Sequence, residues 1–131
     1  MKIICDTHVM IFWADGGSRL SKRASRLIDE NIADGNLACA DISLWEIAQL
    51  CRLGRLTPKT SADSYISDII TAMNLSVLHI SPEIAFISQK NLFEHKDPAD
   101  RLIAATAISH NSKLITKDEK LQRISSLKTI W

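Results

Sequence analysis

The sequence has no large excess of charge of either sign, little glycine or proline, and no long apolar run. Its 131 residues carry 16 basic and 15 acidic side chains, which gives a formal net charge of +1. This balance excludes a globally basic nucleic-acid-binding protein, although it leaves room for a local basic patch. With four glycines, three prolines and 46% hydrophobic residues, the chain is not a disordered tail, a collagen-like chain or a low-complexity linker.

Targeting segments and cysteine pairs are also lacking. No stretch approaches the roughly 20 apolar residues that span a bilayer, and the first residues lack the apolar region and the cleavage site of a signal peptide. Cys5, Cys39 and Cys51 are odd in number, show no CxxC spacing and lie in apolar surroundings, which favours reduced thiols in the core. The sequence therefore predicts a cytoplasmic protein.

Short apolar segments alternate with amphipathic segments along the chain. We expect strands at 2–5, 37–40, 77–80, 114–116 and 128–131, and helices at 8–13, 20–32, 43–53, 61–73, from Ser81, at 98–110 and after Asp118. This alternation predicts a parallel sheet with helices on both faces. Because no linker or internal repeat is present, residues 1–131 are expected to form one α/β domain.

Four acids occupy equivalent places in this predicted fold. Asp6 directly follows the first strand, Asp118 follows the strand near residue 114, and Glu46 and Asp100 lie in the first turns of predicted helices. Ligands of an open parallel sheet bind outside the carboxyl ends of its strands, so we expect these acids to converge. Clustered carboxylates are costly unless a cation lies between them. Mg²⁺ is the natural candidate, with Mn²⁺ also suitable, because hard cations take oxygen ligands.

Most of these acids also have an explanation that involves no ligand. The segments 43–46 and 116–119 match the pattern of a helix capping box, and Asp97 suits the N-cap of the helix that begins at 98, with Asp100 favoured by the helix dipole. A solvated loop acid explains Asp118 equally well. Asp6 is the exception, because an acid at the end of an apolar strand is not a common capping device.

The segments that carry the four acids resemble the motifs of PIN-domain proteins, in the order of that family. They read ICDTH at 4–8, SLWEI at 43–47, HKDPADRLIAATA at 95–107 and LITKD at 114–118. The second and third are most similar to VapC-type toxins of bacterial toxin–antitoxin pairs. The resemblance runs from Ile3 to Asp118, and one departure is Ala99, where many relatives carry an aromatic residue.

This resemblance implies a three-layer α/β/α sandwich with a central, mostly parallel sheet and an acidic pocket. By motif match, the metal-binding and catalytic acids would be Asp6, Glu46, Asp100 and Asp118, with Asp97 left outside the set as an N-cap. The implied activity is an Mg²⁺-dependent endoribonuclease, in which a metal-activated water hydrolyses RNA and leaves a 5′-phosphate and a 3′-hydroxyl. Glu46 would be either a ligand or the base for the attacking water.

Basic side chains must give RNA a positive approach to such a pocket. Arg52 and Arg55 lie in a segment without acids that follows Glu46. We expect them, with Thr7 and Thr116, to contact substrate. Two further basic clusters, within 19–26 and 113–123, are candidates for phosphate contact, although solvated helix faces explain most such runs.

The resemblance also implies a homodimer bound by a small antitoxin, which would place a basic side chain among the acids. Ile11, Phe12 and Trp13 are the apolar residues that we expect to be exposed for such contacts. Two alternatives stay open. One is a catalytically inactive module of the same fold that binds RNA or a partner. The other is a small metal-dependent phosphatase, which should turn over nucleotide monophosphates.

Overall fold

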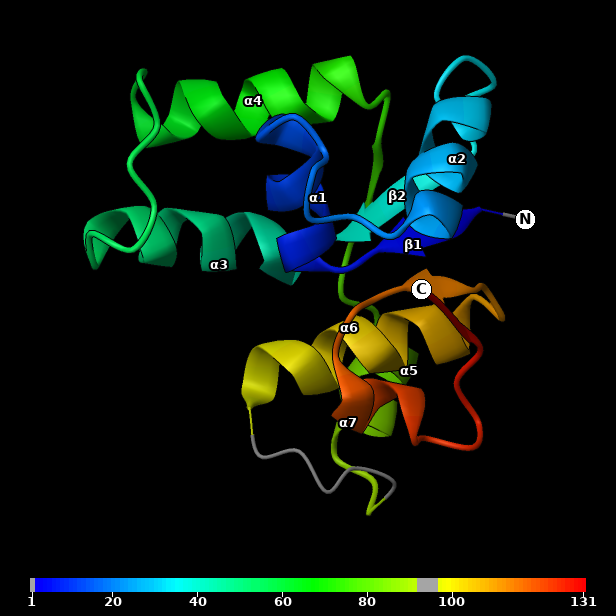
Figure 1. Cartoon of the computed structure of the whole chain (residues 1–131). Coiled ribbons are helices and arrows are strands. Elements are labelled where there is room, and N and C mark those ends of the chain that lie inside the picture. Colours follow the sequence, from blue (N-terminus) through cyan, green and yellow to red (C-terminus); the bar gives the residue numbers. More distant parts are fainter. Residues whose placement is uncertain (1, 92–96) are drawn as a thin grey trace.

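A five-stranded sheet, parallel at every pairing, forms the centre of the protein (Figure 1). The structure is a computed structural model that describes residues 2–91 and 97–131. The strands are β1 (Ile3–Cys5), β2 (Leu37–Ala40), β3 (Ser76–Leu78), β4 (Leu114–Ile115) and β5 (Thr129–Ile130), in the spatial order β3-β2-β1-β4-β5. The predicted parallel sheet is confirmed, with β1 at its centre.

Helices cover both faces of this sheet, which confirms the predicted α/β/α sandwich. They are α1 (Thr7–Ala14), α2 (Lys22–Asn31), α3 (Asp41–Arg52), α4 (Ala62–Ala72), α5 (Pro82–Ser88), α6 (Pro98–Ser109) and α7 (Glu119–Gln122). In Figure 1, α1 to α4 lie on one side of β1 and β2, and α5 to α7 lie on the other. Within the described part of the chain, no helix has the length and apolar character needed to cross a membrane.

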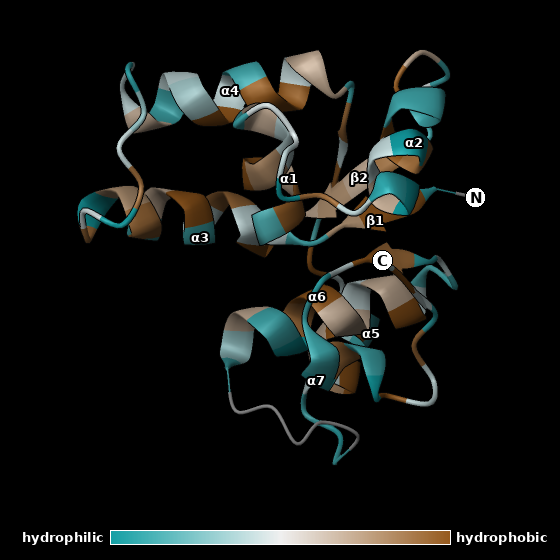
Figure 2. Ribbon diagram, viewed as in Figure 1, coloured by the Kyte–Doolittle hydropathy of each residue, from teal (hydrophilic) through white to brown (hydrophobic). Residues whose placement is uncertain are grey.

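Two apolar cores lie on opposite faces of the sheet because successive side chains of a strand point to opposite sides. Cys5, Leu37, Cys39 and Ile115 face the core under α1, α2 and α4. Ile4, Ala38, Ala40 and Leu114 face the core under α5 to α7. Figure 2 shows β1 and β2 mostly in hydrophobic colours, between helices that carry both hydrophilic and hydrophobic residues. The strands are thus fixed from both sides, and their ends are held in place.

The carboxyl ends of the strands meet helices almost without loops. Asp6 is the single residue between β1 and α1, and α3 begins at Asp41 directly after the last residue of β2. The predicted start of this helix at residue 43 was therefore two residues late. Glu46 lies in the second turn of α3, so the proposed capping box at 43–46 is wrong.

The segment expected to expose apolar side chains packs inward instead. Ile11 is 5% exposed, and Phe12 and Trp13 are partly buried against the same core. The prediction was wrong because α1 is short, lies over the sheet and is apolar from Val9 to its end. Among the described residues, the large hydrophobic side chains at the surface are Trp45, Leu53, Ile80 and Phe86. The three cysteines are free, as predicted.

Candidate metal centre

Asp6 lies at the end of the central strand and is held by two hydrogen bonds. Its Oδ1 accepts from the backbone N–H of Thr7 (2.8 Å), and its Oδ2 accepts from the hydroxyl of Thr116 (2.7 Å). The residue is only 6% exposed. The bond to Thr7 makes Asp6 the N-cap of α1, a role that the sequence reading did not expect. Since each carboxylate oxygen has two acceptor sites, this carboxylate can still bind a cation.

Glu46 is held by the same threonine that binds Asp6. The Thr7 hydroxyl donates to Glu46 Oε1 (2.5 Å), and Thr7 Oγ1 shares a further hydrogen bond with Ser43 Oγ (2.9 Å). Thr7 and Ser43 are fully buried. The backbone of Thr7 therefore orients Asp6, and its side chain orients Glu46. Because Thr7 is buried, it holds both acids from behind the wall of the cavity.

Thr116 links the ends of two neighbouring strands in a similar way. Its hydroxyl donates to Asp6 and accepts from the backbone N–H of Asp118 (3.1 Å). Asp118 in turn caps α7, because its Oδ1 accepts from the backbone N–H of Lys120 (2.8 Å). The helix therefore begins at Glu119, and the capping box suggested for 116–119 is wrong. Like Thr7, Thr116 is fully buried.

Asp97 belongs to the cluster, although the sequence reading left it out. It is the N-cap of α6, as predicted, because its Oδ1 accepts from the backbone N–H of Ala99 (2.9 Å). Nevertheless Glu46, Asp97 and Asp100 each offer a carboxylate oxygen within 4.8 Å of the others. Capping occupies one oxygen of Asp97, so it did not argue against a second role. His95 and Lys96, which begin the third motif, lie outside the described residues.

All four predicted acids line one cavity of about 450 Å³, together with Asp97. Lys117 and His8 are the basic side chains among the described residues of its wall. Arg52 and Arg55 are exposed and are not part of that wall. Arg52 ends α3, roughly 9 Å along the helix axis from Glu46 at the rise of an α-helix. Their contact with substrate stays a prediction.

Burial raises the pKa of both Asp6 and Glu46 above the usual range of a carboxyl group. For Asp6, the charge of Asp118 adds to this effect of burial, and the hydrogen bonds from Thr116 and Thr7 oppose it. For Glu46, burial is again the largest cause, the hydrogen bond from Thr7 opposes it, and the charges of Asp6 and Asp97 add to it. The ionised acids therefore repel one another in a partly desolvated cavity.

The donor set fits a hard divalent cation. The acids supply oxygen ligands alone, which suits Mg²⁺ or Mn²⁺, and the three carboxylates of Glu46, Asp97 and Asp100 are close enough to share one ion. A cation there would offset the repulsion that raises the pKa of Glu46. Asp6 and Asp118 line the same cavity but are not members of this three-carboxylate group.

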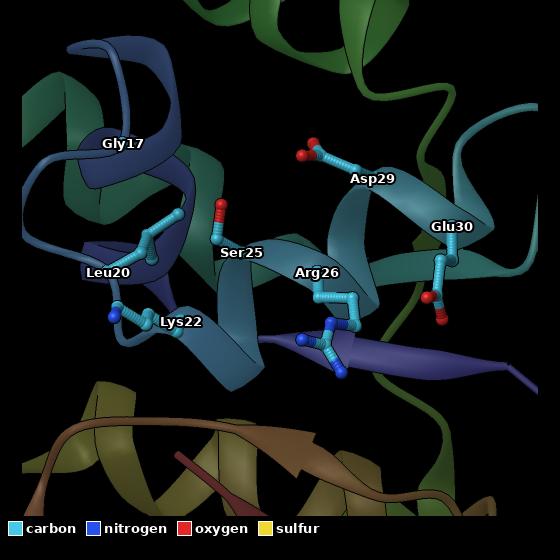
Figure 3. Close-up of a pocket in the computed structure, with 7 residues that line it drawn as sticks. All are labelled: Gly17, Leu20, Lys22, Ser25, Arg26, Asp29 and Glu30. Carbon is cyan, nitrogen blue, oxygen red and sulfur yellow. The ribbon is translucent and has the colours of Figure 1, made fainter.

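A different hollow lies along α2 and shares no lining residue with the acidic cavity (Figure 3). It contains two members of the basic cluster predicted within 19–26, Lys22 and Arg26. Two acids, Asp29 and Glu30, lie in the last turns of the same helix and also line it. The lining therefore has no excess of positive charge and does not favour a phosphate site.

We predict that replacement of Asp6 by asparagine stabilises the metal-free protein as the pH rises. A carboxyl whose pKa is raised by folding favours the folded state at low pH. That contribution is lost as the pH rises from about 4 through the raised folded pKa. In EDTA, Asp6→Asn should therefore gain stability relative to the parent between about pH 4 and pH 7, as measured by urea unfolding.

Asp63→Asn is the matched control, because hydrogen bonding from Ser61 holds the pKa of Asp63 below its usual range. This variant should keep a constant offset in stability from the parent between about pH 4 and pH 7, because a lowered pKa makes its contribution depend on pH only below about pH 4. Equal pH dependence in the two variants would contradict the electrostatic account of Asp6.

Comparison with known proteins identifies relatives of the whole chain. The family model described as PIN domain matches residues 3–127. Ribonuclease VapC22 of Mycobacterium tuberculosis is 35% identical to the chain over 133 residues, with 98% of each sequence covered.

Solved structures agree on the fold. VapBC2 from Rickettsia felis, determined with a DNA fragment from its promoter, has a TM-score of 0.72 at 20% identity, covering 99% of this chain and 98% of that chain. A toxin–antitoxin complex from Klebsiella pneumoniae has a TM-score of 0.67 at 17% identity, covering 99% and 97%. At such identities these structures support the fold alone. Because the family match spans nearly all of the sequence, the chain belongs to the PIN-domain family.

Proposed function

We propose that this protein is a divalent-metal-dependent endoribonuclease that acts as the toxin of a VapBC-type toxin–antitoxin pair. One observation carries the proposal: the acids of four separated motifs line a single cavity at the carboxyl edge of the sheet. Membership of the PIN-domain family and the ribonuclease at 35% identity support it. Residues 1–131 would act as one nuclease domain in the cytoplasm.

The acids of the cavity hold the metal, which is Mg²⁺ or Mn²⁺. When bound, the ion supplies a water of lowered pKa and positive charge for the scissile phosphate. Asp6, Asp100 and Asp118 are its ligands, directly or through water. Glu46 is a ligand or the base that takes a proton from the attacking water.

Lys117 offers the RNA backbone a positive contact at the wall of the cavity. It lies between Thr116, which holds Asp6, and Asp118, so its position is fixed by the same short segment. His8, two residues after Asp6, is exposed and also lines the cavity. Phosphate contacts of this kind contribute affinity that depends strongly on salt.

The protein would also bind partners. An antitoxin is supported by the toxin–antitoxin complex among the structural neighbours, and a basic side chain of the antitoxin among the acids would replace the charge of the metal. For a homodimer we assign α5 as the contact in place of α1, because Phe86 on α5 is 67% exposed and Ile80 just before it is 45% exposed.

We predict that Asp100→Asn gives a folded protein that does not cleave RNA and does not respond to Mg²⁺. If Asp100 only favours the helix dipole, its loss should cost about 0.3–1 kcal/mol. If it binds metal, the variant should also lose the stabilisation that Mg²⁺ gives the parent, about 2.7 kcal/mol at a hundredfold excess over the dissociation constant. Thermal melts with Mg²⁺ or EDTA, and cleavage of total RNA, measure both effects.

Glu83→Gln is the matched control, because Glu83 is an acid in the first turn of α5 that does not line the acidic cavity. It should keep both the Mg²⁺ response and the cleavage. A destabilised Asp100→Asn that still cleaves RNA would overturn the assignment. Turnover of nucleotide monophosphates by the parent would favour the phosphatase. An Mg²⁺-binding parent that cleaves neither substrate would favour the inactive module.

We predict that Lys117→Ala weakens the salt dependence of RNA binding. Each phosphate contact to a single strand contributes about −0.7 to the slope of log K against log salt, so the slope should become shallower by about that amount. Lys113→Ala is the matched control, since Lys113 is an exposed lysine outside the cavity wall. Loss of slope in Arg52→Ala/Arg55→Ala, with none in Lys117→Ala, would instead place the RNA at the far end of α3.

We predict that Phe86→Glu converts a dimer into a monomer, because a charge cannot be buried in an apolar contact without a partner. Light scattering of the parent and the variant measures the mass directly. Leu53→Glu is the control, because Leu53 is 47% exposed and lies at the C-cap of α3 rather than on α5. A monomeric parent, or a dimer that persists in Phe86→Glu, would contradict this contact.

A further inference from the structure

A second cleft opens beside the acidic cavity, between α3 and the first turn of α6. Its volume is about 490 Å³, within the ~300–1,000 Å³ of small-ligand sites. It shares Glu46 and Asp97 with the acidic cavity. We call it the Trp45 cleft, and its remaining lining comprises Ile42, Trp45, Gln49, Pro98 and Ala99.

The spacing along α3 explains why the two cavities adjoin. Side chains three and four residues apart lie on one face of a helix, so Ile42, Glu46 and Gln49 follow one another along α3, with Trp45 beside them. Glu46 lines both cavities, and Trp45 lines the cleft but not the acidic cavity. Trp45 and Glu46 are consecutive in the sequence, so the indole and the carboxylate extend from the same turn of α3.

The cleft combines an aromatic face, an apolar wall and one amide. Trp45 is 56% exposed, although tryptophan is highly buried on average. Opposite α3, Pro98 is exposed, and Ala99 is 4% exposed and has only a methyl group, which leaves room for a flat ring. Gln49 is half-buried and offers both a donor and an acceptor.

We propose that the Trp45 cleft is a nucleobase subsite for the nucleotide next to the scissile phosphate of a single-stranded RNA. The base stacks on the indole of Trp45, and the Gln49 amide contacts the edge of the base. This inference rests on the proposed ribonuclease function. Single-stranded RNA is commonly recognised by such stacking together with hydrogen bonds to exposed base edges.

The Trp45 cleft adjoins the acidic cavity, and this favours a nucleobase over a protein surface as its occupant. Glu46 and Asp97 line both cavities, so a phosphate bound in the acidic cavity would lie beside the cleft, and the neutral base is the part of the nucleotide that can extend into it. A second copy of the chain, or another protein seated flat on the cleft without a basic side chain for these two carboxylates, would bury both of them further. Burial of unpaired carboxylates is costly, and the pKa of Glu46 is already raised by burial.

The first test measures the kinetics of RNA cleavage by the full-length protein with Mg²⁺. Trp45→Ala should raise KM by roughly 5- to 150-fold, which is the range of one base stack on an aromatic ring. It should leave kcat within about twofold, and Trp45→Tyr should restore most of the loss. Leu53→Ala is the matched control, because Leu53 is an exposed apolar residue at the C-cap of the same helix and outside the cleft, and this variant should behave as the parent does.

The second test asks whether the cleft reads the base. Sequencing the products from a randomised RNA pool should show that Gln49→Ala broadens the preference at one position beside the cut, with little change in kcat. An unchanged KM in Trp45→Ala, together with an unchanged cut-site distribution in both variants, would overturn the proposal.

The third test separates this inference from the proposed function. In the Asp100→Asn background, a short RNA should quench the tryptophan fluorescence, and Trp45→Phe in the same background should remove that quenching. Quenching at Trp45 would support the subsite even if the parent cleaved no RNA. Two results would overturn it in favour of a protein occupant: conversion of a dimer to a monomer by Trp45→Ala, or loss of antitoxin binding with unchanged RNA kinetics.

Discussion

Two buried threonines hold the carboxylates of this protein together against their mutual repulsion. Thr7 binds Asp6 through its backbone N–H and Glu46 through its hydroxyl. The hydroxyl of Thr116 donates a hydrogen bond to Asp6 and accepts one from the backbone N–H of Asp118. Charged hydrogen bonds of this kind are among the strong ones, and here they fix acids from three elements relative to one another. The cavity is therefore shaped before any cation enters it.

The sheet supplies the frame for these contacts. All pairings are parallel, so the ends of β1, β2 and β4 meet at one edge. Apolar cores on both faces fix the strands, and helices begin at once after β1 and β2. Short connections leave the acids little freedom, which lowers the entropy that a bound cation or phosphate must remove. The parallel topology therefore both restricts the motion of the acids at this edge and brings their charges close together.

The sequence was sufficient to predict the parallel sheet and the convergence of the four acids. The carboxyl ends of all strands in a parallel sheet lie at one edge, so the prediction did not require the order of the strands. It was not sufficient for the helix starts. Nothing local shows that α3 begins at Asp41, so Glu46 was assigned to the wrong turn. Asp97 was omitted because its capping role is plain from the sequence, whereas its approach to Glu46 depends on how α3 and α6 pack. Packing over the sheet likewise decided the burial of Ile11.

The hydrogen bond between Thr116 and Asp6 joins residues 110 positions apart, and β4 pairs directly with β1. During translation, Asp6 therefore leaves the ribosome long before Thr116, the residue that orients it, is added to the chain. Any nascent or truncated chain that ends before β4 lacks both this partner and Asp118. The order of synthesis alone thus keeps the growing chain from assembling the centre until β4 and Asp118 have been made.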